Sequence, residues 1–305
     1  MRFPTLTRIH GTLMVCVLWW LMVGCGASSS HFSDPMQPAT PPSPVPIGHV
    51  VLVVEENHSY SEVIGNAAMP YLNNLATTYG LATQYYADTH PSIGNYFMLT
   101  TGQIVTNNEL VAPPTVTADN VVRDLLGAGK TWKSYAESLP SVGYLGGDVY
   151  PYAQHHNPFV FLQDAITPAQ VNNIVPFTQF AADLAAGQLP NFSFIVPNQL
   201  NNAHDGTLAQ ADTWLSQNIA PLISSPLFQK DGLLIIVFDE SDFTDLTNGG
   251  GHVPAVVVSA RAKKGFQSTN TYQHQSTLHF ILSSLGVTDF PGLSSVAPDM
   301  NEFLQ

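Results

Sequence analysis

The chain has 305 residues, of which 45% are hydrophobic and only 10% are charged. This length and composition predict a folded domain with a buried core, and they exclude a disordered tail protein or a long coiled coil. Nine Lys and Arg residues stand against 22 Asp and Glu residues, and the resulting net charge of −13 excludes duplex nucleic acid as the main partner. A chain this acidic would need a metal ion to handle phosphate groups.

The first 24 residues predict a secretory signal. Arg2 and Arg8 precede an apolar run over residues 13–23, which is too short for a membrane span of about 20 residues. Residues 21–25 read LMVGC and resemble a bacterial lipobox, which would make Cys25 the lipidated first residue of the mature protein. The alternative is an ordinary cleaved signal. We therefore expect export to the periplasm or the outer surface, with a lipid anchor to the membrane under the first interpretation.

The remaining sequence divides into a short spacer and one domain. Cys16 and Cys25 are the only cysteines, so a disulfide framework, a zinc–thiolate site and a cysteine nucleophile are all excluded. Residues 25–47 are rich in Ser and Pro, which is typical of a flexible spacer. No internal repeat and no second change in composition follow, and we expect a single domain over residues 48–305.

Short apolar runs alternate with helical patterns along this domain. The runs are typical of strands buried on both faces, and they cover residues 49–55, 81–86, 131–135, 191–196, 233–239 and 253–259. The helical patterns cover residues 71–79, 95–101, 119–128, 177–186, 207–219 and 275–285. The alternation predicts an α/β domain with a mostly parallel central sheet flanked by helices. In such folds ligands bind beyond the carboxyl ends of the strands.

Acidic and amide side chains follow two of the predicted strands. Glu56 and Asn57 come directly after the first strand, and Asp239 and Glu240 end the run at 233–239. Carboxylates at a buried strand end are costly unless a positive group compensates them, and oxygen-rich sets of this kind suit a hard divalent ion. A helix N-cap with solvated carboxylates is the alternative for the acid pair. Strand alternation points the adjacent Glu55 to the other face of the sheet.

A serine and several histidines are further candidates. Ser92 lies between a strand-like and a helix-like run, where backbone N–H groups and the positive end of the helix dipole favour a phosphoryl group. The alternative is that Ser92 only caps the helix. His204, His252 and His274 each lie in a polar break beside an apolar element, and a structural histidine is the alternative for each of them.

Six segments, in this order, resemble the phosphoesterase family that contains bacterial acid phosphatases and the non-zinc phospholipases C, within the alkaline phosphatase-like superfamily. The segments are ENHSY at 56–60, HPSIGNY at 90–96, HNPF at 156–159, PNQLNNAHD at 197–205, DE at 239–240, and HVP at 252–254 with HQS at 274–276. The resemblance extends from residue 48 to about residue 286. It implies an alkaline phosphatase-like α/β fold.

The resemblance also implies residue roles. Ser92 would be the nucleophile, and His204 is our candidate for protonating the leaving group because an imidazole titrates near neutral pH. A divalent metal ion (Ca, Mg, Mn or Zn) would be held by Glu56, Asn57, Asp239 and Glu240, with His252 as a ligand where a second metal binds. Contacts to the substrate would come from Asn95, His156, Asp205 and His274.

The chain departs from the family pattern at four positions: Gly94 replaces the usual Pro, Phe238 a frequent Trp, Asn202 a common Asp and His155 a frequent Arg. These changes put a second metal site and one phosphate-binding charge in doubt. The expected activity is hydrolysis of small phosphate esters through a phosphoserine intermediate, as a broad-specificity acid phosphomonoesterase. One alternative is a phospholipase C-type phosphodiesterase, and the other is a surface lipoprotein that binds a ligand on a decayed phosphatase scaffold.

Overall fold

The computed structural model describes residues 47–305 except 111–112 and 114. The predicted signal, Cys25 and the spacer up to residue 46 lie outside the described residues, whereas Ile47, the last residue of the predicted spacer, is buried and donates its N–H to the Ser284 carbonyl. The segment Val45–Gln305 is one compact unit by itself. None of its described helices combines the length and the apolar character needed to cross a membrane.

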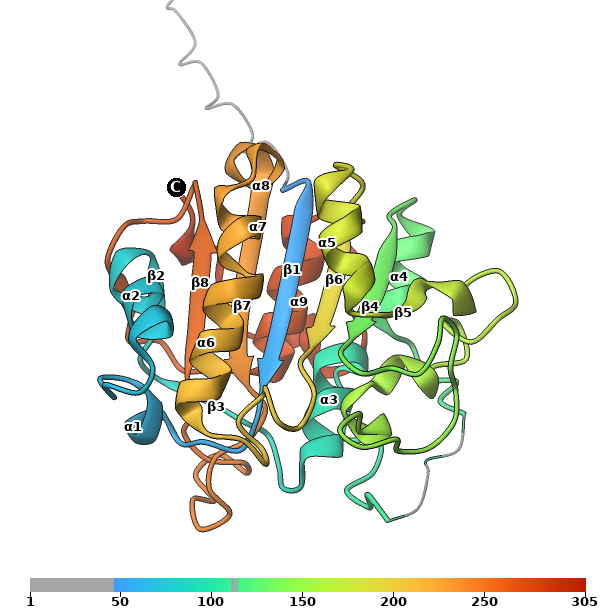
Figure 1. Cartoon of the computed structure of the whole chain (residues 1–305), viewed down its shortest axis with the longest axis horizontal. Coiled ribbons are helices and arrows are strands. Elements are labelled where there is room, and N and C mark those ends of the chain that lie inside the picture. The colour runs from blue at the N-terminus through green and yellow to red at the C-terminus, as the bar shows by residue number, and fades with distance from the viewer. Residues whose placement is uncertain (1–46, 111–112, 114) are drawn as a thin grey trace, which may run out of the picture. The chain divides into compact units, whose positions relative to one another are not determined.

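The centre of the fold is an eight-stranded sheet with the strand order β5-β4-β6-β1-β7-β8-β2-β9 (Figure 1). Only β8 runs antiparallel to its neighbours β7 and β2, so the prediction of a mostly parallel sheet is confirmed. The strands are β1 (His49–Glu55), β2 (Gly80–Ala82), β4 (Trp132–Ala136), β5 (Ile174–Pro176), β6 (Phe192–Val196), β7 (Gly232–Phe238), β8 (Ala255–Ser259) and β9 (Phe266–Ser268). A separate parallel pair consists of β3 (Tyr85–Tyr86) and β10 (Tyr272–Gln273).

Helices cover both faces of this sheet (Figure 1). The face toward the viewer carries α5 (Thr178–Ala185), α6 (Leu208–Asn218), α7 (Ala220–Ser224) and α8 (Pro226–Asp231), with α2 (Pro70–Thr78) packed beside α6 and the short α1 (Tyr60–Val63) at the same side. The opposite face carries α3 (Ser92–Thr101), α4 (Val121–Gly127) and α9 (His274–Ser284). Short 3₁₀ turns occupy Gln154–His156, Pro158–Val160, Val171–Asn173, Gly292–Val296 and Asn301–Phe303.

The central strands β1 and β7 are apolar on both faces because helices cover both. Their sequences, HVVLVVE and GLLIIVF, are rich in β-branched residues, and nearly every side chain is fully buried. The two strands pair in parallel register from His49↔Gly232 to Glu55↔Phe238. The residues that follow them, Glu56 and Asp239, therefore emerge side by side at the same edge of the sheet.

The predicted elements are largely present, with differences at short segments. All six predicted helices form, as α2, α3, α4, α5, α6 and α9. The helix predicted from residue 95 begins three residues earlier, at Ser92, so that this serine is its first residue. The run at 81–86 is not one strand: it divides into β2 and β3, which belong to different sheets. The separation falls at Thr83, whose backbone and hydroxyl both donate to the Ser268 carbonyl.

Candidate active site

Three chain segments that are far apart in sequence meet at the carboxyl ends of β1 and β7. Glu56 and Asn57 leave β1, and Asp239 and Glu240 leave β7, with the Asp239 N–H donating to the Glu55 carbonyl at 3.0 Å. Asn57 has a φ of 47°, a left-handed conformation that Asn adopts more readily than most residues and that turns the chain sharply after the strand. The third segment is the start of α3.

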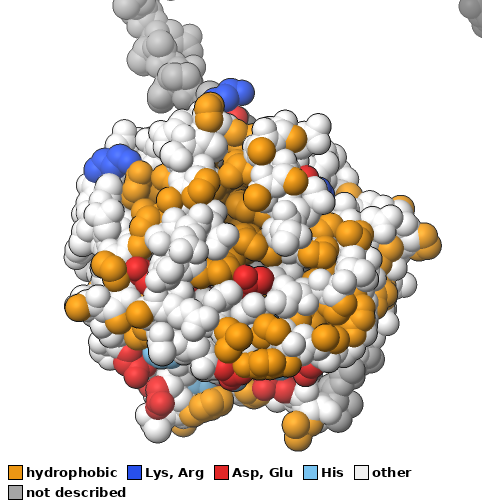
Figure 2. Space-filling model, viewed as in Figure 1, with side chains coloured by type: hydrophobic (Ala, Val, Ile, Leu, Met, Phe, Trp, Pro, Cys, Tyr) orange, Lys and Arg blue, Asp and Glu red, His pale blue; other side chains and the backbone are white. Residues whose placement is uncertain are grey.

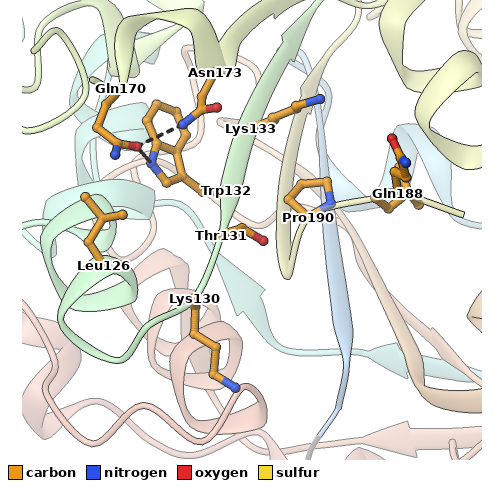
Figure 3. A pocket seen from close by; sticks show the side chains of 10 residues that line it. Leu126, Lys130, Thr131, Trp132, Lys133, Gln170, Asn173, Gln188 and Pro190 are labelled. Carbon is orange, nitrogen blue, oxygen red and sulfur yellow. Dashed lines mark hydrogen bonds between the residues drawn. The ribbon is translucent and has the colours of Figure 1, made fainter. Parts of the chain in front are cut away.

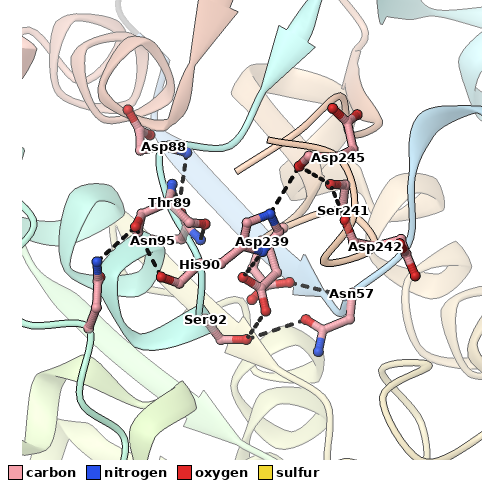
Figure 4. A network of polar contacts seen from close by, with 12 residues as sticks. Asn57, Asp88, Thr89, His90, Ser92, Asn95, Asp239, Ser241, Asp242 and Asp245 are labelled. Atoms are coloured by element: carbon pink, nitrogen blue, oxygen red, sulfur yellow. Dashed lines mark hydrogen bonds and ion pairs between the residues drawn. The ribbon is translucent and has the colours of Figure 1, made fainter. Parts of the chain in front are cut away.

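The hydroxyl of Ser92 is the point on which these segments converge (Figure 4). Its Oγ lies 3.1 Å from Glu240 Oε1, 3.3 Å from Glu56 Oε2 and 3.3 Å from Asn57 Oδ1. A hydroxyl has one proton, so it can donate to only one of these three acceptors at a time. The structure thus brings the serine into direct contact with three of the four side chains expected to bind a metal ion.

The carboxyl groups at this point are buried without a permanent positive charge beside them. Glu56, Asp239 and Glu240 have no exposed surface, and no Lys or Arg in the described part of the chain forms an ion pair with them. Burial, followed by the charge of Asp239, raises the pKa values of Glu56 and Glu240 well above the ordinary range. Burial also raises the pKa of Asp239, and Asp239 Oδ2 has no hydrogen-bond partner.

This donor set fits a hard divalent ion. One atom of the Asn57 amide lies 3.0 Å from Glu56 Oε2, 3.2 Å from Asp239 Oδ1 and 3.3 Å from Glu240 Oε1. With nitrogen at that position the amide can donate to two of these carboxylates at a time. With oxygen there the four oxygens suit a cation or a shared proton. Oxygens that share one small ion lie about 3 Å apart. No group of three His, Cys, Asp or Glu side chains among the described residues is arranged to hold a metal ion by itself, so a metal site here would also use the Asn57 amide and the Ser92 hydroxyl.

Two residues that the sequence analysis did not assign hold the carboxylates in place. The Tyr96 hydroxyl donates to Glu56 Oε1, and His90 Nδ1 lies 2.7 Å from Glu240 Oε2. Tyr96 follows Ser92 by four positions in α3, so both side chains lie on the same face of the helix. That spacing was the available signal for Tyr96, whereas the position of His90 depends on the fold of the β7–β8 loop.

The predicted residues His156, His204 and Asp205 form a second group beside this centre. His156 is buried, its Nδ1 lies 3.4 Å from Glu56 Oε1, and its ring stacks on Tyr96 at 5.1 Å. The His204 ring lies 5.8 Å from that of His156, and its Nδ1 lies 2.7 Å from Asp205 Oδ1. Burial lowers the pKa of His156 well below its ordinary value, and its Nε2 is buried without a partner.

His274 is not positioned to bind substrate as predicted. It is fully buried, with Nε2 2.6 Å from the Asp239 carbonyl oxygen and Nδ1 3.0 Å from the Tyr85 hydroxyl. Burial lowers its pKa to about 4, so the ring is neutral at pH 7. Its location behind the Asp239 backbone makes it a support for the end of β7.

Asn95, a predicted substrate contact, shapes the loop that leads to Ser92. Its Oδ1 accepts from the backbone N–H groups of Asp88 and Thr89, and its Nδ2 donates to the Thr89 carbonyl. These three bonds shape the loop before Ser92 and use both lone pairs of Oδ1 but only one of the two Nδ2 hydrogens.

His252 does not join the carboxylates as a metal ligand. Its ring is stacked between Tyr60 at 4.4 Å and Tyr86 at 4.9 Å, and its Nε2 lies 3.0 Å from the Thr83 carbonyl oxygen. The aromatic stack and this contact hold the imidazole away from the Ser92 centre.

The amino end of α3 carries an anion from the protein itself. The Ile93 N–H, which follows Ser92 and was expected to face a phosphoryl group, donates to Glu109 Oε1 at 3.1 Å. Glu109 lies in the loop after α3, and nothing in its local sequence indicated that this loop folds back onto the start of the helix.

A surface hollow of about 340 Å³ lies at the opposite end of the sheet (Figure 3). It is lined by Lys130, Trp132, Lys133 and Gln170 among others, at the amino end of β4, and it contains none of the groups described above. The chemistry implied by the buried carboxylates and Ser92 is therefore not located there.

The fold is that of the alkaline phosphatase superfamily. A protein of that superfamily from Vibrio parahaemolyticus superposes with a TM-score of 0.60 at 15% identity, over 86% of this chain and 71% of that one. A phosphonate monoester hydrolase from Silicibacter pomeroyi gives a TM-score of 0.55 at 13% identity, over 84% of this chain and 76% of that one. These likenesses concern the fold alone.

The sequence comparisons are more specific. Residues 66–288 match the phosphoesterase family. A phosphatidylinositol-3-phosphatase of Mycobacterium tuberculosis is 33% identical over 238 residues, which are 78% of this chain and 75% of that protein. A phosphate-repressible acid phosphatase of Penicillium chrysogenum is 31% identical over 235 residues, 71% of this chain but only 54% of the fungal protein. The chain belongs to the phosphoesterase family and is a phosphoester hydrolase.

Proposed function

We propose that the protein is a metal-dependent phosphomonoesterase that works through a phosphoserine formed at Ser92. The observation that carries this proposal is the position of the Ser92 Oγ, 3.1–3.3 Å from the side chains of Glu56, Asn57 and Glu240. A serine in a purely structural role would not be expected at the centre of a buried group of carboxylates.

Glu56, Asn57, Asp239 and Glu240 would hold one divalent ion, whether Ca, Mg, Mn or Zn. When bound, such an ion supplies the positive charge that lowers the pKa of a neighbouring hydroxyl and offsets the charge of a phosphoryl group. Tyr96 and His90 keep the carboxylates of Glu56 and Glu240 oriented toward Ser92 through the contacts described above.

The reaction has two displacement steps at phosphorus. Ser92 Oγ passes its proton to the Glu240 carboxylate 3.1 Å away and attacks the phosphorus atom, so that the Oγ–P bond forms and the bond from phosphorus to the leaving oxygen breaks. His204, oriented by Asp205 through its Nδ1, donates a proton to the leaving oxygen. Water then attacks the phosphoserine and gives one proton back to His204. The Oγ–P bond breaks, Ser92 Oγ takes its proton back from Glu240, and inorganic phosphate is released. His156, with its unpartnered Nε2, is the nearest candidate for a contact to a phosphoryl oxygen.

Small phosphate monoesters are the substrates we favour, because several relatives are acid phosphatases by name. Because one relative is a phosphatidylinositol-3-phosphatase, we propose lipid phosphoesters as a second substrate class. The hydroxyl and the four candidate ligands lie together, which argues against a decayed scaffold that only binds a ligand. We also propose that the protein is exported and anchored through Cys25.

The test is release of nitrophenol from its phosphate monoester, compared with its phosphorylcholine diester and with buffer, before and after chelation and metal replacement. The Ser92→Ala variant should lose turnover and still bind metal, while Ser224→Ala, an exposed serine of α7, should match the parent protein. Acid quenching during turnover should trap a phosphorylated chain in the parent but not in Ser92→Ala. Full activity in Ser92→Ala would refute the assignment of the nucleophile.

A further inference from the structure

Large hydrophobic side chains are exposed mainly at the catalytic end of the molecule. Three loops there, at residues 102–110, 137–153 and 239–254, carry most of the exposed large hydrophobic residues in the described part of the chain: Ile104, Leu110, Val142, Leu145, Val149, Tyr150, Phe243 and Leu246. Those elsewhere are Leu126, Leu293 and Val296. Figure 2 shows hydrophobic side chains at the lower edge, the edge toward which β1, β6 and β7 point in Figure 1.

Four of these residues form what we call the apolar rim. Leu110 is 97% exposed, Leu246 68%, Tyr150 63% and Phe243 60%. Isolated exposed hydrophobic residues are common on protein surfaces, but a group of strongly exposed ones around one site usually marks a binding surface. These four side chains lie on loops and are not packed against the core, so they do not contribute to the stability of the fold.

Three rim residues either contact His90 or are adjacent in sequence to a residue that contacts His90 or the start of α3. Leu110 follows Glu109, which binds the Ile93 N–H. The Phe243 ring lies 5.2 Å from the His90 ring. Leu246 follows Asp245, whose carbonyl oxygen lies 3.1 Å from His90 Nε2.

Tyr150 precedes Pro151, whose carbonyl oxygen accepts from the Gln199 N–H. The Gln199 carbonyl in turn accepts from the N–H of Asp205, the partner of His204. The four rim residues therefore lie on loops that also carry or contact residues of the proposed site.

The charge around the rim restricts the kind of partner. The neighbouring titratable side chains include Glu109, Asp148, Asp205, Asp242 and Asp245. The Lys and Arg ion pairs found among the described residues involve other acids, namely Asp119, Asp164, Asp183 and Asp231. A strongly anionic surface would be repelled by this acidic border, whereas a zwitterionic surface would not.

We infer that the apolar rim docks the enzyme onto the surface of a zwitterionic amphiphile, with Leu110, Phe243 and Leu246 inserted among its apolar chains. When the rim side chains insert among the apolar chains of an amphiphile aggregate, the phosphoester headgroups lie beside the loops of the proposed site. Docking would therefore bring a headgroup close to Ser92. A protein seated on the rim would instead cover the entrance to the site. The binding does not require catalysis, but delivery of a headgroup to Ser92 rests on the proposed function with its second substrate class, lipid phosphoesters.

The test measures co-sedimentation of the segment Val45–Gln305, which is a compact unit and lacks the predicted anchor, with phosphatidylcholine vesicles. The Ser92→Ala background prevents hydrolysis. Burying a leucine side chain favours partitioning roughly tenfold or more. The double variant Leu110→Ser, Leu246→Ser should therefore bind about a hundredfold more weakly. The matched control, Leu293→Ser with Val296→Ser, replaces exposed apolar residues outside the rim and should bind like its parent.

Vesicles rich in phosphatidylglycerol should bind more weakly than phosphatidylcholine vesicles at low salt. The inference is overturned if the parent does not bind phosphatidylcholine vesicles, or if the rim variant binds as well as the control. It is also overturned if sedimentation shows rim-dependent self-association in place of vesicle binding. Hydrolysis of nitrophenyl phosphate is measured separately, with the protein that keeps Ser92. If that protein is no more active than Ser92→Ala but binds vesicles through the rim, the proposed function fails and the inference about the rim stands.

Discussion

Chelation of the proposed divalent ion should destabilise the protein at neutral pH and have little effect in acid. Without an ion, the folded state holds Glu56, Asp239 and Glu240 close together and out of water. Below their ordinary pKa values near 4, all three are protonated in both the folded and the unfolded chain, and they cost nothing. As the pH rises the unfolded chain ionises first, so the metal-free folded state loses stability through the range of the raised pKa values.

The size of the effect follows from the shifts. Burial raises the pKa of Asp239 from 3.8 to about 6, so this carboxyl alone costs the metal-free protein about 3 kcal/mol above that pH. An ion present at a hundred times its dissociation constant contributes a similar amount, about 2.7 kcal/mol. For a domain of this size about 3 kcal/mol corresponds to a change in Tm of roughly 6–12 °C.

The assay is thermal unfolding of the metal-free and metal-loaded protein across the range from acid to pH 8. The difference in Tm should grow with pH and should shrink at every pH in Glu240→Gln, which removes one charge from the set. Glu302→Gln is the control, because that carboxylate interacts with Ser268 and Tyr272, away from the site. A Tm difference that is the same in acid and at pH 8, or that survives intact in Glu240→Gln, would refute the reasoning.

Three further predictions concern single residues. Tyr96→Phe keeps the ring stacked on His156 but loses the bond to Glu56, so metal affinity measured by calorimetry should fall about 10-fold or more; unchanged affinity would remove its positioning role. Burial raises the pKa of Asp124 to about 7, so Asp124→Asn should raise the unfolding free energy in urea by up to about 4 kcal/mol at pH 8 and by almost nothing near pH 3. An equal gain at both pH values would contradict this. Ile235→Ala in the fully buried β7 should cost about 2–5 kcal/mol in the same experiment, and a loss below 1 kcal/mol would mean that the core relaxes into the cavity.

The sequence predicted the parts of the site that follow long apolar strands. Glu56 and Asp239 were identifiable because β1 and β7 are continuous apolar runs, and parallel strands end at the same edge of a sheet. The two- and three-residue strands β3, β5, β9 and β10 carry too few residues for a recognisable pattern, and their pairing is set by tertiary contacts. Sequence could therefore place the centre of the sheet but not its edges.

Side-chain direction was the second limit. His274 and His252 lie in polar breaks beside apolar elements, as functional histidines often do, but the fold turns one behind Asp239 and stacks the other between tyrosines. His90 shows the reverse, since its contact with Glu240 depends on two loops separated by 150 positions in the chain. Residue type and local pattern cannot distinguish these cases, because each is decided by what packs against the ring.

The carboxylate of Glu109 accepts a hydrogen bond from the Ile93 N–H at the start of α3. It therefore competes with any phosphate group for this backbone N–H. Any phosphate group that reaches this amide has to displace a tethered anion, whose effective concentration is set by the loop and not by the solution. This displacement weakens the binding of the substrate ester and of the product, inorganic phosphate, by the same amount. Substrate therefore binds more weakly, and the product dissociates more easily. Glu109→Gln, which neutralises the competitor, should consequently bind inorganic phosphate more tightly and suffer more from its accumulation during turnover.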